Sequence, residues 1–230
     1  MSDPKPQPTG GLEAQNSWIQ RTVMKNPWVF FGVLGVILLT TMQLCNTRSK
    51  TLSPLMILGE VGEFSLIDQT GQPFGSEQLK GKVWVASFFF TSCQTLCPKI
   101  SIANGEVQEL FEEAGLDASQ AMIVSFTVDP EIDTPERLTT YAKNYGADPA
   151  RWRFLTGPNE VLFKVIAKRF QTAMGDKVKD AQGIDDITHS PKLVLVDAFG
   201  RIRHYFASDD PRHRELLVQH AIKLVADAQP

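Results

Sequence analysis

Two apolar runs constrain the fold of this chain most strongly. Residues 82–90 and residues 121–128 are apolar at nearly every position. Strands that are buried on both faces of a sheet show this pattern, because neither side of such a strand meets water. The sequence therefore predicts two central strands in a sheet that is covered on both faces.

The segments around these runs alternate between strand and helix patterns. Helical spacing of apolar residues recurs in residues 98–115, 134–145, 159–170 and 210–228. Shorter strands are predicted at residues 64–68, 152–155, 192–197 and 201–206, with turns at 69–72 and 199–200. This order predicts an α/β fold with a mixed sheet flanked by helices.

An uncharged segment precedes the predicted α/β region. Residues 26–47 contain no charged side chain, and about 20 apolar residues in a helix span the hydrocarbon core of a bilayer. Pro27 suits the first turn of a helix, and Trp28 suits the headgroup interface. The segment lacks the short apolar core and small-residue cleavage site of a signal peptide. We therefore expect a single N-terminal transmembrane helix at residues 26–47.

The predicted anchor divides the rest of the chain into three parts. Residues 1–25 are polar and rich in proline and glycine, which predicts a disordered tail. Residues 48–61 form a linker whose apolar stretch, 52–58, either lies along the membrane or packs on the domain. Residues 62–230 form the folded domain. Basic residues flank the anchor on both sides, so these charges alone do not fix its orientation.

Composition excludes two classes of protein. The net charge is −3 and the sequence contains no basic run that could follow a phosphate backbone, so nucleic acid is not an expected partner. Three cysteines are too few for a disulfide-stapled scaffold. Cys45 stands alone at the end of the apolar segment, and the residues before it are not the small ones that a lipid-modified cysteine requires. We interpret it as a small apolar residue at the membrane edge.

The other two cysteines follow the first apolar run. Cys93 and Cys97 are four residues apart at a predicted strand-to-helix transition. On a helical turn, residues at this spacing lie about 5–6 Å apart, which suits one shared metal ion or a disulfide. The positive end of the helix favours the thiolate that both chemistries need. Two ordinary buried cysteines are the structural alternative.

A histidine is the natural third ligand for such a pair. Two soft thiolates and one imidazole suit Cu(I), whereas structural zinc normally takes four ligands. His213 and His220 are predicted to face solvent on the last helix, and His204 is a packing or surface residue of a strand. His189 differs, because it lies in the polar loop 182–190 just before a predicted buried strand. Loops in that position often carry function.

Several motifs occur in one order along the chain. They are Phe90–Pro98, Thr127–Pro135, Trp152–Gly157, and His189 before Leu193–Asp197. This ordered set resembles the Sco/SenC family of copper-binding assembly factors for cytochrome c oxidase. The resemblance covers about residues 60–228. It implies a thioredoxin-like domain, which in this family is usually tethered by one N-terminal helix.

The resemblance also implies roles for individual residues. Cys93 and Cys97 are the expected thiolate ligands of copper, and His189 is the expected third ligand. Asp129 and Asp133 match the family's acidic pair, and we expect them to shape the site from behind the ligands or to face a partner. A local alternative is that Asp129 holds the turn before the next helix while Asp133 caps that helix.

Two positions depart from the family pattern. Gln94 stands where the family commonly has proline, and Thr188 stands where it commonly has aspartate. Asp185 and Asp186 lie a few residues upstream of the histidine. The loop geometry and the hydrogen bonding of His189 are therefore expected to differ from those of typical members.

By this resemblance, the expected function is that of a copper metallochaperone. It would hold Cu(I), with Cu(II) as a second candidate, and deliver it to the CuA site of cytochrome c oxidase subunit II. Other copper chaperones or thiol reductants are further candidate partners. The alternative function is a membrane-anchored thiol-disulfide oxidoreductase that reduces cysteines of a partner. The expected location is the bacterial inner membrane, crossed once, with the tail of residues 1–25 in the cytoplasm and the C-terminal domain in the periplasm.

Overall fold

The computed structural model describes residues 55–172, 174–179, 185–189 and 191–228, together with residues 28, 31, 32, 34–38 and 40. For residues 174–179 and 185–189 it describes the backbone alone. The chain divides into two units, Met1–Ser53 and Pro54–Pro230. The predicted tail, most of the predicted anchor and Cys45 lie outside the described residues. Within the described part of the chain, no helix combines the length and the apolar character needed to cross a membrane.

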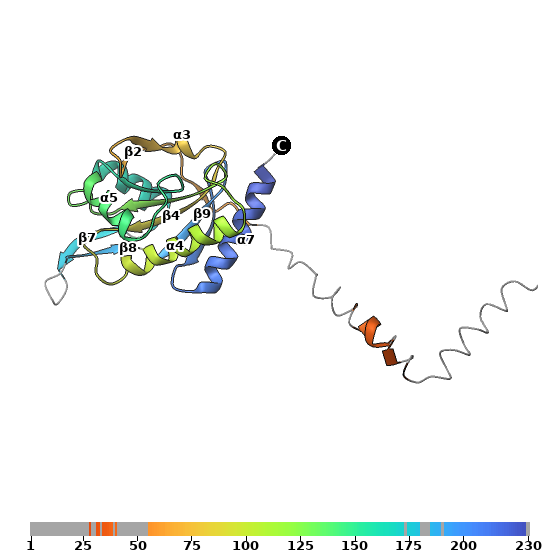
Figure 1. The fold of residues 1–230 in the computed structure, drawn as a ribbon. Coiled ribbons are helices and arrows are strands. Elements are labelled where there is room, and N and C mark those ends of the chain that lie inside the picture. The colour runs from red at the N-terminus through yellow and green to blue at the C-terminus, as the bar shows by residue number, and fades with distance from the viewer. Residues whose placement is uncertain are drawn as a thin grey trace, which may run out of the picture. The chain divides into compact units, whose positions relative to one another are not determined.

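An eight-stranded mixed sheet forms the centre of the second unit (Figure 1). Its strand order is β1-β10-β9-β4-β5-β6-β2-β3. The strands are β1 (Gly59–Glu60), β2 (Ser65–Asp68), β3 (Pro73–Gly75), β4 (Val83–Phe89), β5 (Ala121–Thr127), β6 (Trp152–Thr156), β9 (Lys192–Val196) and β10 (Arg201–Ala207). β4, β5 and β6 are parallel, and the remaining neighbours are antiparallel. The predicted mixed sheet is confirmed.

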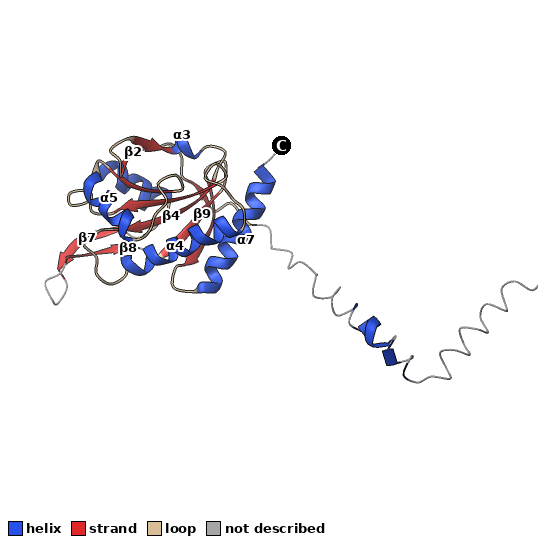
Figure 2. Ribbon diagram, viewed as in Figure 1, coloured by secondary structure: helices blue, strands red, loops and turns tan. Residues whose placement is uncertain are grey.

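Helices flank this sheet (Figure 2). They are α3 (Ser76–Leu79), α4 (Cys97–Glu113), α5 (Pro135–Asn144), α6 (Asn159–Phe163) and α7 (Pro211–Ala228), with the π-helix η1 (Lys164–Arg169) after α6. The predicted helix at 159–170 is thus an α-helix that continues as a π-helix. α4 and α7 pack against each other and against β4. An ion pair of 2.5 Å between Arg214 and Glu106 joins these two helices.

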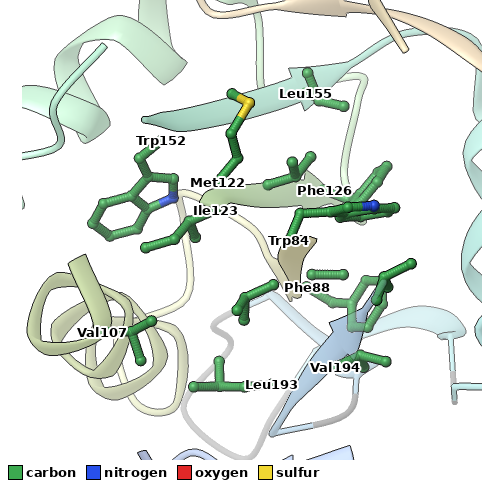
Figure 3. Close-up of a cluster of buried hydrophobic side chains, with 14 of the residues drawn as sticks. Trp84, Phe88, Val107, Met122, Ile123, Phe126, Trp152, Leu155, Leu193 and Val194 are labelled. Atoms are coloured by element: carbon green, nitrogen blue, oxygen red, sulfur yellow. The ribbon is translucent and has the colours of Figure 1, made fainter. Parts of the chain in front are cut away.

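The two apolar runs form the middle of the core. Every residue of β4 and β5 is buried, as predicted for strands covered on both faces. The ring of Phe126 lies 6.0 Å from that of Phe88, 5.7 Å from that of Phe170 and 6.4 Å from that of Trp84. Figure 3 shows part of this core, to which β4, β5, β6, β9 and α4 all contribute side chains. Burial of each large side chain stabilises the fold by about 1.5–3 kcal/mol, so the core holds both strands rigidly.

A second, two-stranded sheet corrects the sequence prediction for residues 182–190. In place of a loop, the structure has β7 (Met174–Lys179) paired antiparallel with β8 (Asp185–His189). Figure 1 shows this hairpin at one edge of the unit. The backbone hydrogen bonds between two such strands form whatever the side chains are, so the pair does not require an apolar run. Their polar sequence therefore did not reveal them.

The predicted linker also contains ordered structure. β1 lies within residues 48–61 and pairs with β10, so the sheet begins before the predicted boundary at residue 62. Leu55 packs against the core, whereas Met56, Ile57 and Leu58 are exposed. Only the side chain of Leu55 therefore packs on the domain, and the other three of these apolar side chains are exposed on its surface.

The last helix corrects a prediction about its histidines. His220 was expected to face solvent, but it is only 6% exposed, with its ring 6.2 Å from that of Phe206. It lies three residues after the buried Leu217, so it belongs to the buried face of α7. His213 is half-buried, and its Nδ1 accepts a hydrogen bond of 3.3 Å from the backbone N–H of Ala207.

Candidate metal centre

The two predicted ligand cysteines lie where β4 gives way to α4. β4 ends at Phe89, and residues 90–96, the cysteine loop, connect it to α4, which begins at Cys97. Pro98 occupies the first turn of α4, where its missing N–H leaves no hydrogen bond unmade. Cys93 lies in the loop itself. The strand, loop and helix therefore occur in the predicted order.

The sulfur atoms of the pair accept hydrogen bonds from the backbone. The N–H of Cys97 donates to the sulfur of Cys93 over 3.4 Å, and the N–H of Phe90 donates to the sulfur of Cys97 over 3.4 Å. Neither cysteine forms a disulfide. Cys93 is 8% exposed and Cys97 is fully buried. Only the first of the two sulfurs is therefore near the surface.

The two thiols differ strongly in acidity. The Cys97 thiol donates a hydrogen bond to the Cys93 sulfur and lowers the pKa of Cys93, against the opposing effect of burial. Backbone groups of Cys97, Thr95 and Leu96 contribute in the same direction. The pKa of Cys97 is raised because its proton is held in that hydrogen bond and because the residue is buried. The reduced pair is therefore one thiolate, at Cys93, and one thiol.

A buried carboxylate fixes the start of the cysteine loop. Asp133 is fully buried, and it accepts hydrogen bonds from the backbone N–H of Thr91 at 3.1 Å and from the hydroxyl of Thr91. The hydroxyl of Thr127 also donates to it over 2.5 Å. Burial raises the pKa of Asp133, while these hydrogen bonds oppose the rise. Asp133 thus ties the loop to the end of β5.

These contacts decide between the alternatives for Asp133. The N-cap of α5 is Thr134, whose hydroxyl accepts the N–H of Arg137 over 3.5 Å. The prediction that Asp133 caps this helix is therefore wrong. A fully buried carboxylate also cannot face a partner protein. Asp133 instead supports the cysteine loop from behind.

Asp129 organises the turn that precedes α5. Its carbonyl accepts the N–H of Asp133 over 2.9 Å and that of Ile132 over 3.2 Å. Its own N–H donates to the hydroxyl of Thr127 over 3.0 Å. The backbone carbonyl and N–H of Asp129 therefore hold this turn, as the local alternative predicted. The residue is only 4% exposed.

The topology brings the backbone near His189 to the edge of the sheet where the cysteines lie. His189 is the last residue of β8, opposite Met174, and β9 begins at Lys192. β9 is antiparallel to β4, so the start of β9 and the end of β4 share one edge. The side chain of His189 lies outside the described part of the structure. Among the side chains that are described, no three His, Cys, Asp or Glu residues form a metal-binding group.

Comparison with known proteins identifies the family of this chain. The model of the SCO1/SenC family matches residues 58–225. The chain belongs to the SCO1/SenC family. The resemblance drawn from its ordered motifs is thereby confirmed.

Solved structures of other family members share this fold. A SCO1/SenC family lipoprotein from Bacillus anthracis str. Ames is 31% identical, with a TM-score of 0.67 over 76% of this chain and 99% of that one. ScoI of Bradyrhizobium japonicum with copper bound is 27% identical, with a TM-score of 0.60 over 71% and 98%. BsSco, described as a cytochrome c oxidase assembly protein with a disulfide switch, is 30% identical, with a TM-score of 0.60 over 76% and 98%. The predicted Sco-type, thioredoxin-like fold is confirmed.

Three side chains of this SCO1/SenC domain were not singled out from the sequence. They are Thr91 and Thr127, which bind Asp133, and Arg137, which binds Thr91. One signal was available, because Thr91 and Thr127 are hydroxyl residues at the carboxyl ends of two adjacent parallel strands. Side chains at such ends converge. The signal for Arg137 is weaker, since it depends on how α5 packs.

Proposed function

We propose that this SCO1/SenC protein is a copper metallochaperone that binds Cu(I) through Cys93, Cys97 and His189. The observation that carries the proposal is the reduced cysteine pair, in which the sulfur of Cys93 is favoured as thiolate. The pair lies at the edge of the sheet where β9 begins, just after His189 in the chain. Two thiolates and one imidazole form a soft, three-coordinate set that suits Cu(I). The copper-bound structure of Bradyrhizobium japonicum ScoI supports the choice of metal.

The protonation of the pair determines how the metal binds. Cys93 offers a thiolate, whereas Cys97 must lose the proton that it shares with Cys93. Copper loading therefore releases about one proton from the pair at neutral pH. Burial of both sulfurs keeps water away from the ion, and oxidation to a disulfide would abolish binding. Cu(II) is a second candidate ion for the same ligands.

The recipient in this proposal is the CuA site of cytochrome c oxidase subunit II. The description of BsSco as a cytochrome c oxidase assembly protein supports a respiratory partner. The proposal also includes a membrane anchor at residues 26–47 and a domain in the periplasm. The Bacillus anthracis relative is a lipoprotein, which supports attachment to a membrane. Other copper chaperones or thiol reductants would load or reduce the site.

The test is titration of the reduced full-length chain with Cu(I) in competition with a chelator. We expect one tightly bound Cu(I) per wild-type chain and none in the Cys93→Ser/Cys97→Ser double variant. Binding in His189→Ala should be at least tenfold weaker, because loss of the imidazole ligand leaves two-coordinate copper. Cys45→Ser and His204→Ala are matched controls that should bind as the wild type does. A wild-type chain that ignores Cu(I) would refute the proposal.

A second candidate function is supported by the asymmetry of the two thiols. The Cys93 thiolate, the more exposed sulfur, could attack a partner disulfide and form a mixed disulfide. Cys97, after losing its proton, would displace the partner as a dithiol and leave a Cys93–Cys97 disulfide. A thiol reductant must then restore the pair. Turnover of a disulfide substrate by a chain that binds no copper would favour this function.

A further inference from the structure

Arg137 of α5 forms hydrogen bonds to the cysteine loop. The Nε and Nη2 atoms of Arg137 donate to the hydroxyl oxygen of Thr91 over 3.3 Å and 3.1 Å. That hydroxyl in turn donates to the buried carboxylate of Asp133. The guanidinium of Arg137 is therefore held in one orientation. It is bound to Thr91, which lies two positions before Cys93 in the chain.

The placement of this arginine is not explained by helix stability. Arg137 is exposed and lies in the first turn of α5, where the positive end of the helix dipole disfavours a cation. Within the described part of the chain, no carboxylate forms an ion pair with it, and its partner is the neutral hydroxyl of Thr91. Its remaining N–H groups are thus available to an incoming acceptor.

A groove lies beside this guanidinium. It has a volume of about 400 Å³ and is lined by Thr91 of the cysteine loop and by Glu136, Arg137, Thr140, Tyr141 and Asn144 of α5. The side chain of Glu136, the other charged residue in the lining, is hydrogen-bonded to Thr134 at the helix cap. Arg137 is therefore the positive charge in the lining, beside the negative charge of Glu136.

We propose that Arg137 binds a carboxylate of the protein that receives copper, and that this groove is the docking site for that acidic residue. The inference rests on the proposed function and adds a recognition residue to it. A guanidinium held by one edge presents its free N–H groups to a carboxylate with defined geometry. Because Thr91 is near Cys93 in the chain, a carboxylate bound here brings the neighbouring part of the partner next to the thiolate.

The experiment measures copper transfer from the full-length, Cu(I)-loaded chain to the apo form of the soluble CuA domain of subunit II. Arg137→Gln should lower the second-order rate constant about tenfold at low salt, and Arg137→Glu should lower it further, because rim charges act mainly on association. The difference from wild type should shrink as salt is raised, since screening weakens the same attraction. Glu136→Gln, which removes a repelling charge, should speed transfer.

Arg212→Gln is the matched control. It removes the same charge from an exposed arginine at the start of α7 that pairs with Asp210, so transfer should continue at the wild-type rate. Equal rates for wild type and Arg137→Gln at low salt would overturn the docking proposal and leave the copper function standing. A loss of Cu(I) affinity in Arg137→Gln that accounts for the whole decrease would overturn it too, because Arg137 would then act on the loop through Thr91. A wild-type chain that binds no Cu(I) would overturn both.

Discussion

The backbone N–H of Cys97 donates a hydrogen bond to the sulfur of Cys93 over 3.4 Å. This bond lies at the positive end of α4, so the donor and the helix dipole both favour a negative charge on Cys93. The sulfur of Cys97 is fully buried instead and keeps its proton. The cysteine loop and the start of α4 thus make two chemically different groups out of two cysteines.

The first prediction concerns the reactivity of these two thiols. Because the pKa of Cys93 is lowered, its thiolate persists well below the usual thiol pKa of about 8.5. A small alkylating reagent should therefore modify Cys93 of the reduced, metal-free protein at pH 6, while Cys97 remains unmodified. Mass spectrometry of peptides after timed labelling measures both rates, with the urea-unfolded chain as the reference. A Cys93 rate that rises only above pH 8 would contradict the assignment.

The second prediction concerns the support of the cysteine loop by Asp133. Asp133→Ala leaves the N–H and hydroxyl of Thr91 and the hydroxyl of Thr127 without their acceptor. An unpaired buried donor costs about 1–3 kcal/mol, and of these three groups only the Thr127 hydroxyl is fully buried, whereas the half-buried Thr91 can turn to water, so the free energy of unfolding should fall by about 2–4 kcal/mol in all. Urea denaturation measures this loss. Asp209→Ala, at an exposed position, is the control and should unfold as the wild type does.

Much of the fold follows from patterns that burial imposes on the sequence. The runs at β4 and β5 are apolar because both faces of these strands are covered, so their central position could be predicted. The start of α5 could be predicted because Thr134 and Pro135 carry the chemistry of a helix cap and a first turn. The hairpin of β7 and β8 could not, because its strands pair only with each other and need no apolar face.

The candidate site is only partly visible in the sequence. Cys93 and Cys97 stand out by their spacing after a buried strand. The sequence left two roles open for Asp133, because an aspartate before a helix also suggests a cap, whereas its observed contacts depend on Thr91 of the cysteine loop. Contacts between side chains that are distant in the chain require the three-dimensional packing. Arg137 was missed for the same reason.

The third prediction concerns the turn between β9 and β10. Burial alone would raise the pKa of Asp197, but hydrogen bonds from Arg203, Arg201 and the N–H of Phe199 outweigh burial and lower it. Its carboxylate lies 2.7 Å from Arg203 and 2.8 Å from Arg201. Asp197→Ala should therefore lower the free energy of unfolding at pH 7 by about 2–4 kcal/mol, because two cations lose a buried partner.

The pH dependence of this effect has a definite sign. A carboxylate whose folded pKa is lowered stabilises the protein above its unfolded pKa of about 3.9, and this stabilisation is lost as the pH falls through the folded value. The difference between wild type and Asp197→Ala should be full at pH 7 and pH 5 and should shrink below pH 4. Denaturant titrations at these pH values measure it. A difference that stays constant down to pH 3 would show that the charge of Asp197 is not the cause.

The fourth prediction concerns the buried histidine of α7. Burial lowers the pKa of His220, and the nearby His204 and Lys223 add to the effect. Its Nδ1 atom has no hydrogen-bond partner within the described structure. The folded protein therefore holds His220 neutral, whereas the unfolded chain binds a proton below about pH 6.5. Stability should fall as the pH drops through this range, by at most about 1.4 kcal/mol per pH unit from this group.

His220→Leu should remove this loss, because leucine fills the space beside Phe206 without a group that titrates. Between pH 7.5 and pH 5.5, the free energy of unfolding of His220→Leu should change less than that of wild type. Gln219→Leu, at the adjacent exposed position, adds the same side chain but should keep the wild-type pH dependence. Equal slopes for wild type and His220→Leu would mean that other groups cause the acid sensitivity. A flatter slope in His220→Leu alone would show that the buried imidazole causes the loss of stability in acid.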